Sequence, residues 1–224
     1  MDKANILHTL NIIIHISAGT IALLLGLAAL ITKKGQNTHK KVGNIFLKML
    51  LIVVFTGLIG VFIFGRNTFL LVITVLSAYQ GFSGYRILKT KSNEPRLLDI
   101  SVAIISLISV SYFLYYFKSI GMIWTPVIIY STVGVLLFLI TYDFARYFIK
   151  KSKYQNLWLY EHIYKMIGAF TALLAAFAGT VFAKYQPLSQ ILPSAFGIVL
   201  QIGFIIYYSR NKNITQQIKN SRQK

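Results

Sequence analysis

The chain has 224 residues, of which 56% are hydrophobic and 12% are charged, with a mean hydropathy of +0.64. A soluble domain carries about 25% charged residues, so this composition excludes an ordinary water-facing surface. The net charge of +18 would suggest nucleic-acid binding in a soluble protein, but the basic residues cluster between apolar runs. The lack of cysteine excludes disulfides, thiolate metal sites and covalently attached c-type haem.

Apolar segments close to the ~20 residues that cross a bilayer as a helix follow one another along the chain. They cover about residues 6–31, 45–64, 69–88, 97–117, 123–142, 158–182 and 191–208. Lys33 and Lys34 end the first segment where a signal peptide needs a small-residue cleavage site, so we expect a retained helix. Pro126 lies in the first turn of the fifth segment, and Pro187 and Pro193 mark a loop before the seventh.

The fold predicted from these segments is all-α, a polytopic transmembrane bundle of seven helices that forms one domain over residues 1–209. Nineteen of the 23 lysines and arginines lie on one side, which leaves Lys3, Arg66, Lys118 and Lys184 on the other. The positive-inside rule then places the N-terminus outside and the C-terminus in the cytoplasm. We expect the basic face to contact anionic lipid headgroups, and residues 210–224 to form a mobile polar tail.

The first segment carries His15, Gly19, Ala22, Gly26 and Ala29 on one helical face. The small residues on this face favour close helix packing. His15 lies about 14 Å below the outer boundary at the helical rise of ~1.5 Å per residue. An ionisable group at that depth is costly, which leaves three alternatives. His15 is a neutral imidazole bonded to a carbonyl or tyrosine hydroxyl, a cofactor ligand, or a proton-handling group.

His39 follows the first segment, and Glu161 and His162 begin the sixth. Two histidines and a carboxylate resemble a metal centre, so we consider a site formed by His39, His162 and Glu161. An alternative is that acidic residues at this boundary form salt bridges that fix the helix ends. A third is a headgroup or phosphate site built from His39, Lys40, Lys41 and Arg86. A bis-histidine haem is disfavoured, because His15 and His162 differ in depth by roughly 10–15 Å.

The chain resembles a family of bacterial membrane proteins known as domain of unknown function 2306. Three stretches carry the resemblance: residues 15–43, Phe82–Arg86 with Tyr85, and Trp158–Gly168 followed by Leu192-Pro193. The resemblance implies a seven-helix inner-membrane protein with His15, His39, Arg86 and His162 at motif positions. It implies no activity. Lys40 departs from the arginine of many relatives, which weakens a bidentate phosphate contact there.

The sequence leaves three functions open. The first is a histidine-dependent redox, quinone or metal-handling module that uses His15, His39 and His162. The second is a small-solute or ion transporter whose path passes His15 and the polar run Ser77–Tyr85. The third is a non-catalytic assembly or accessory subunit that docks through its basic face, or a homo-oligomer. Common catalytic motifs such as HExxH and Gly-rich phosphate loops do not occur, so an enzyme is not favoured.

Overall fold

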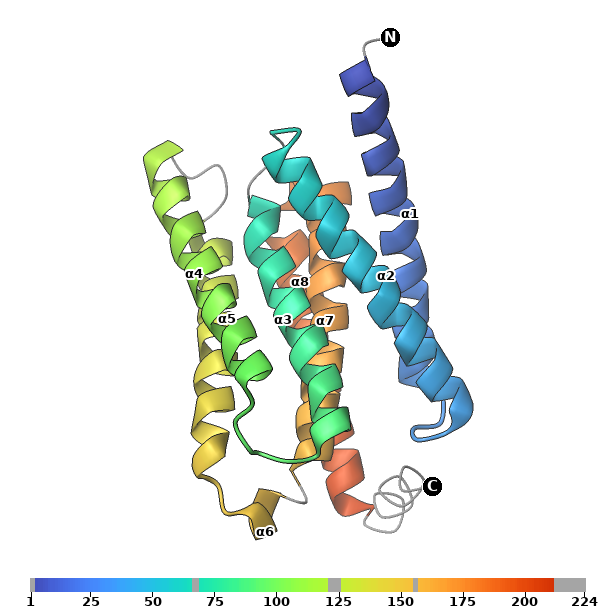
Figure 1. Ribbon diagram of the computed structural model, residues 1–224. Coiled ribbons are helices and arrows are strands. Elements are labelled where there is room, and N and C mark those ends of the chain that lie inside the picture. Colours follow the sequence, from blue (N-terminus) through green and yellow to red (C-terminus); the bar gives the residue numbers. More distant parts are fainter. Residues whose placement is uncertain (1–2, 66–68, 121–125, 155–156, 212–224) are drawn as a thin grey trace. The chain divides into compact units, whose positions relative to one another are not determined.

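The computed structural model describes residues 3–65, 69–120, 126–154 and 157–211, which contain helices and no strand. The long helices are α1 (Lys3–Ile31), α2 (Asn37–Phe62), α3 (Phe69–Thr90), α4 (Leu97–Ile120), α5 (Pro126–Ala145), α7 (Trp158–Val181) and α8 (Leu188–Arg210) (Figure 1). The short ones are α6 (Lys151–Tyr154) and the 3-10 turns η1 (Arg146–Phe148) and η2 (Ala183–Tyr185). The all-α prediction is confirmed. The predicted tail lies almost wholly outside the described residues.

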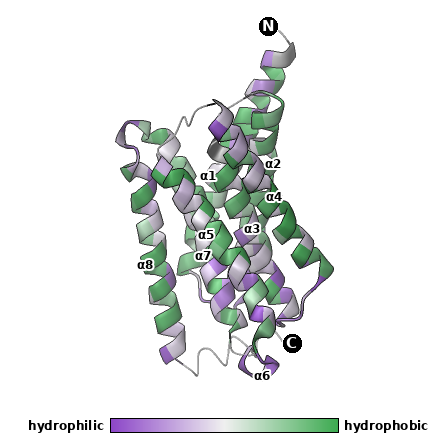
Figure 2. Ribbon diagram, turned by 90° about the vertical axis from the view of Figure 1, so that its left-hand side faces the viewer, coloured by the Kyte–Doolittle hydropathy of each residue, from purple (hydrophilic) through white to green (hydrophobic). Residues whose placement is uncertain are grey.

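Within the described residues, six helices are long and apolar enough to cross a membrane: α1, α2, α4, α5, α7 and α8. Large apolar side chains such as Ile31, Leu97 and Phe148 are exposed, and Figure 2 shows apolar residues along most of the length of the long helices. Lipid rather than water is the solvent that suits such surfaces. The protein is therefore a multi-pass membrane protein. The polar second half of α3 keeps this helix out of the six, so the seventh crossing and the orientation stay predictions.

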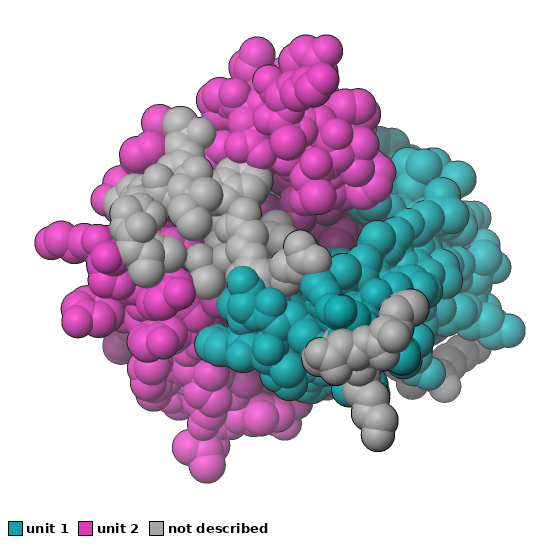
Figure 3. Space-filling model, turned by 90° about the horizontal axis from the view of Figure 1, so that it is seen from above, with its two compact units in different colours: residues 1–65, 199–224 teal, residues 66–198 magenta. Residues whose placement is uncertain are grey.

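The chain divides into two compact units, residues 1–65 with 199–224, and residues 66–198 (Figure 3). The single domain expected over residues 1–209 stays a prediction. In the first unit α1 packs along α2, and Ala18, Ala22 and Gly26 are buried one turn apart. A Cβ on Gly19 would lie 3.8 Å from the side chain of Val53, so small residues on this face do permit close packing with α2.

The turn between α1 and α2 is held by Lys34. Its ammonium donates to the carbonyls of Ala29 and Leu30 at 2.7 Å each, and to that of Thr32 at 3.2 Å. These carbonyls lack partners within the helix, and a cation also complements the negative end of the helix dipole. Gly35 follows with a φ of 83°, which favours glycine. The sequence predicted that the first helix ends at Lys33 and Lys34, and the bonds of Lys34 to the last helical carbonyls explain this end.

The second unit is built around α3, which packs along α7 and also contacts α4 and α5. A Cβ on Gly84 of α3 would lie 3.1 Å from Cβ of Lys165, so the two helices approach closely. Pro126 is the first residue of α5, as its fixed φ predicts. The prediction for Pro193 was wrong. It lies inside α8, early enough that little regular helix precedes it, and Pro187 alone marks the boundary.

The start of α2 also differs from its predicted place. The helix begins at Asn37, eight residues before the apolar segment does, so His39, Lys40 and Lys41 are helical. Hydropathy marks where a chain enters the apolar phase, whereas a helix extends as far as its own hydrogen bonds continue. The basic turn is therefore much shorter than the sequence indicated.

Substitution of Gly197 by alanine tests the packing of α8 on α7. The new Cβ would lie 2.8 Å from Cβ of Thr171 and closer still to its Oγ1 and Cγ2. Because Thr171 is β-branched and cannot rotate away freely, we expect Gly197→Ala to lower the free energy of unfolding by about 1–3 kcal/mol in detergent. Gly203→Ala in the same helix meets no atom within 4 Å and is the control, with an unchanged or slightly raised stability. Equal stabilities of the two variants would contradict this packing.

Candidate functional site

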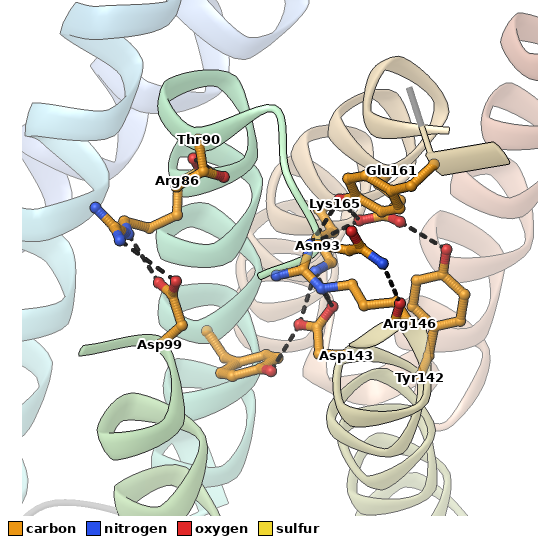
Figure 4. A network of polar contacts seen from close by, with 11 residues as sticks. Arg86, Thr90, Asn93, Asp99, Tyr142, Asp143, Arg146, Glu161 and Lys165 are labelled. Carbon is orange, nitrogen blue, oxygen red and sulfur yellow. Dashed lines mark hydrogen bonds and ion pairs between the residues drawn. The ribbon is translucent and has the colours of Figure 1, made fainter. Parts of the chain in front are cut away.

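Four charged side chains gather where α5 ends and α7 begins (Figure 4). Asp143 and Arg146 are three residues apart, and Glu161 and Lys165 are four apart, so each pair shares one helical face. The two faces meet, and α3 contributes Tyr79 to the same cluster. We call these four residues with Tyr79, Tyr142 and Tyr154 the buried charge network.

Asp143 is the centre of the first half of the network. Lys165 Nζ donates to its Oδ1 at 2.5 Å and to its Oδ2 at 2.7 Å. The Tyr79 hydroxyl donates to Oδ2 at 2.7 Å, and Arg146 Nε lies 3.7 Å from Oδ1. Both carboxylate oxygens thus face donors, which is the environment of an ionised aspartate.

Glu161 is the centre of the second half. Arg146 Nη1 donates to its Oε2 at 2.9 Å, and Tyr154 donates to the same oxygen at 3.0 Å. Tyr142 donates to Oε1 at 2.7 Å. Burial and the Glu161 carboxylate raise the pKa of the Tyr154 phenol above its ordinary value, so this hydroxyl stays protonated and keeps its role as a donor.

The network is deeply buried and electrically neutral. Asp143 and Glu161 are 6% exposed, Arg146 is 5% and Lys165 is 1%. Two positive charges balance two negative ones. Removal of charges from water costs several kcal/mol per ion before pairing, so each member depends on its partners. Removal of one member would leave a buried charge without its partner, which destabilises the fold.

A second ion pair lies beside the network, nearer to solvent. Arg86 Nε and Nη2 approach Asp99 Oδ1 and Oδ2 at 2.7 and 3.3 Å, and the side chains are 20% and 12% exposed. The loop after α3 is fixed by Asn93, whose Nδ2 donates to the carbonyls of Arg146 at 2.9 Å and Ile149 at 2.6 Å. A cavity of about 10 Å³ is lined by both Asp99 and Asp143.

The predicted candidates His15 and His39 belong to the first unit. His15 Nδ1 lies 2.8 Å from Thr56 Oγ1, which also lies 2.7 Å from the Ile52 carbonyl and 3.1 Å from the Val53 carbonyl. The His15 ring thus bonds the Thr56 side chain across the α1–α2 contact. His39 Nδ1 lies 3.3 Å from Thr32 Oγ1 at the end of α1. The two histidines have different threonine partners.

The other candidates belong to the second unit. His162 donates through Nδ1 to the Gly84 carbonyl at 3.0 Å, which ties α7 to α3. The Lys89 ammonium lies 5.5 Å from the centre of the Tyr85 ring, and Arg86 pairs with Asp99. Of the predicted residues, Glu161 alone is a member of the buried charge network.

The predicted metal centre of His39, His162 and Glu161 draws on both units and stays a prediction. Within the described part of the chain, no group of three His, Cys, Asp or Glu residues could hold a metal ion. A cofactor at His15 likewise stays a prediction. The predicted salt bridges at the helix ends are confirmed for Asp99, Asp143 and Glu161, each of which pairs with a basic residue.

Sequence reasoning missed the central role of Lys165 and Asp143. Lys165 was counted with the basic loops, although it lies seven residues after Trp158, inside the predicted sixth helix. A lysine at that depth is the signal that could have revealed it, because a buried cation requires an anion nearby. Asp143 directly follows the predicted end of the fifth helix, where an acidic residue is ordinary and gives no sign of a buried partner.

Comparison of the chain with protein-family models, with curated proteins and with solved structures finds no match.

Replacement of Lys165 by methionine tests the dependence of the network on charge balance. The variant leaves Asp143 buried without its main partner, so we expect the free energy of unfolding to fall by about 3–5 kcal/mol. The double variant with Asp143→Leu carries no uncompensated charge and should recover part of this loss. SDS-induced unfolding of the purified protein measures both.

The control is Lys151→Met, which breaks the solvent-exposed pair with Glu94, whose nitrogen and oxygen are 2.6 Å apart. Exposed ion pairs contribute little, so this variant should unfold like the wild type. Equal losses from the two lysine substitutions would show that burial of the network does not matter.

Proposed function

We propose that the protein is an ion transporter whose ion is the proton, and that Asp143 and Lys165 are its proton-handling pair. The supporting observation is the burial of four ionised side chains, at 6% exposure or less, among helices with membrane-spanning hydropathy. Ionisable residues within membrane helices face bundle interiors and mark proton relays and ion pathways. The proposal develops the transporter hypothesis but moves its centre from His15 to this network.

The Asp143–Lys165 contact suits a change of protonation. A proton that moves from Lys165 Nζ to a carboxylate oxygen breaks an N–H bond and forms an O–H bond, and the electron pair stays on nitrogen. Both groups become neutral. At separations of 2.5 and 2.7 Å the transfer requires no movement of heavy atoms. Neutral partners lose their Coulomb attraction, so transfer also loosens α7 from α5.

A purely mechanical role is the other interpretation of the same contacts, in which the network only holds α3, α5 and α7 together. The two roles differ in what a neutral isostere does. Asparagine at position 143 keeps the shape and one acceptor oxygen but cannot take up a proton.

We expect Asp143→Asn to slow potential-driven proton uptake at least tenfold. Purified protein in liposomes, with a valinomycin-imposed potassium diffusion potential and an internal pH dye, gives the rate. Glu94→Gln, which alters an exposed carboxylate, should leave the rate unchanged. If folded Asp143→Asn protein takes up protons as fast as the wild type, the network has only a mechanical role. If the wild-type protein itself takes up no protons, the proposed function is wrong.

We further propose the topology and source that the sequence suggested: seven crossings, an outside N-terminus, and a bacterial inner membrane within the family of domain of unknown function 2306. In this arrangement α3 crosses too, because its charged end pairs with Asp99 and its polar run faces α7. The redox and accessory-subunit hypotheses stay predictions.

Single cysteines test this topology, since the chain has none of its own. Ile63→Cys and Ser119→Cys lie at the ends of α2 and α4, and Ser92→Cys lies between α3 and α4. In intact cells a membrane-impermeant maleimide should label positions 63 and 119, whereas position 92 should react only after permeabilisation. Labelling of positions 63 and 92 from the same side would mean that α3 does not cross.

A further inference from the structure

The small cavity beside the buried charge network has the properties of a binding site. Its lining includes Ser83 and Arg86 of α3, Asp99 and Ala103 of α4, and Asp143 and Arg146 from the end of α5 and from η1. All of these residues belong to the second unit. The cavity therefore lies where three helices bring polar side chains to one point, between the partly buried Arg86–Asp99 pair and the buried charge network.

Two polar atoms on the cavity lining have no hydrogen-bond partner among the described residues: Ser83 Oγ and Arg146 Nε. Both residues are more than nine-tenths buried. Arg146 Nε lies 3.7 Å from Asp143 Oδ1, which is an ion pair but too long for a hydrogen bond. A buried donor without a hydrogen bond is costly, and a guanidinium N–H is among the strongest donors in proteins. Their common position on one small cavity indicates a ligand that accepts from Arg146 Nε and exchanges a hydrogen bond with Ser83.

The size and charge of the cavity select the ligand. A volume of about 10 Å³ corresponds to a single water molecule. Arg86 and Arg146 balance Asp99 and Asp143, so the lining has no net charge, and an ion of either sign would meet as much repulsion as attraction. Water is neutral, accepts from Arg146 Nε, and has two hydrogens for the neighbouring oxygens.

We infer that this cavity binds one water molecule, which joins Asp143 to the Arg86–Asp99 pair. The inference rests on the proposed function for what the water does: it carries protons between the buried network and solvent. Exposure rises along this route, from 1% at Lys165 to 6% at Asp143, and to 12% and 20% for the Asp99 and Arg86 side chains.

The transfer balances. The Asp143 carboxyl, protonated by Lys165, gives its proton to the water oxygen, and the water gives one of its own hydrogens to the Asp99 carboxylate. One O–H bond breaks and one forms at each step, and water is regenerated. Asp99 then exchanges its proton with the bulk solvent.

Water binding is tested by NMR on detergent-solubilised protein with ¹⁵N-labelled arginine. The Arg146 Nε–H signal, identified by its loss in Arg146→Lys, should show a cross-relaxation peak to water of the sign that a long-lived bound molecule gives. Ser83→Ala is the control for relay through the exchangeable hydrogen of the Ser83 hydroxyl. The peak should persist in this variant if it comes from the bound water, and it should vanish if it is relayed through Ser83. Ala103→Leu fills the cavity and should remove the peak, and Ala103→Val is the smaller alternative if leucine prevents folding. A wild-type Arg146 signal without a water peak overturns the site.

The proton route is tested separately in liposomes with Asp99→Asn. We expect at least tenfold slower proton uptake, while the water peak at Arg146 persists. A variant that conducts like the wild type would overturn the route through Asp99 even if the water is bound. If the wild-type protein conducts no protons but shows the water peak, the proposed function fails and the water site stands.

Discussion

The ion pair between Asp143 and Lys165 is the contact on which the second unit depends. It joins α5 to α7 at a place almost closed to bulk solvent, so each charge depends mainly on its protein partners. The surrounding donors follow from this constraint. Tyr79 from α3 donates to the same carboxylate, and Arg146 continues the alternation of charge to Glu161. Close packing of α3 on α7, permitted by Gly84, places Lys165 against α3.

Hydropathy alone predicted the number and approximate bounds of the long helices, because a chain in lipid satisfies its backbone within each helix. The same property hid the site. Hydropathy treats Lys165 as an interruption, and its partner lies 22 residues away on another helix. Which helices meet depends on side-chain packing that no local pattern encodes. The start of α2 and the place of Pro193 were missed for a related reason, since helix ends follow hydrogen bonds rather than polarity.

The histidines show how far residue type predicts chemistry. A histidine at the depth of His15 suggests a cofactor ligand, yet its Nδ1 bonds the Thr56 hydroxyl of the neighbouring helix. Likewise His162 donates to a backbone carbonyl exposed by the absence of a side chain at Gly84. Both rings fix helix contacts through one nitrogen.

Asn93 has a mechanical consequence. Its amide donates to two carbonyls that follow α5, so the segment after α3 is bonded to the segment after α5. Rotation of either helix alone would break two hydrogen bonds at once. The contact between α5 and α7 differs in kind, because the Asp143–Lys165 ion pair holds it through charge. Asn93 thus connects the ends of α3 and α5, whereas a different contact, the Asp143–Lys165 ion pair, connects α5 to α7.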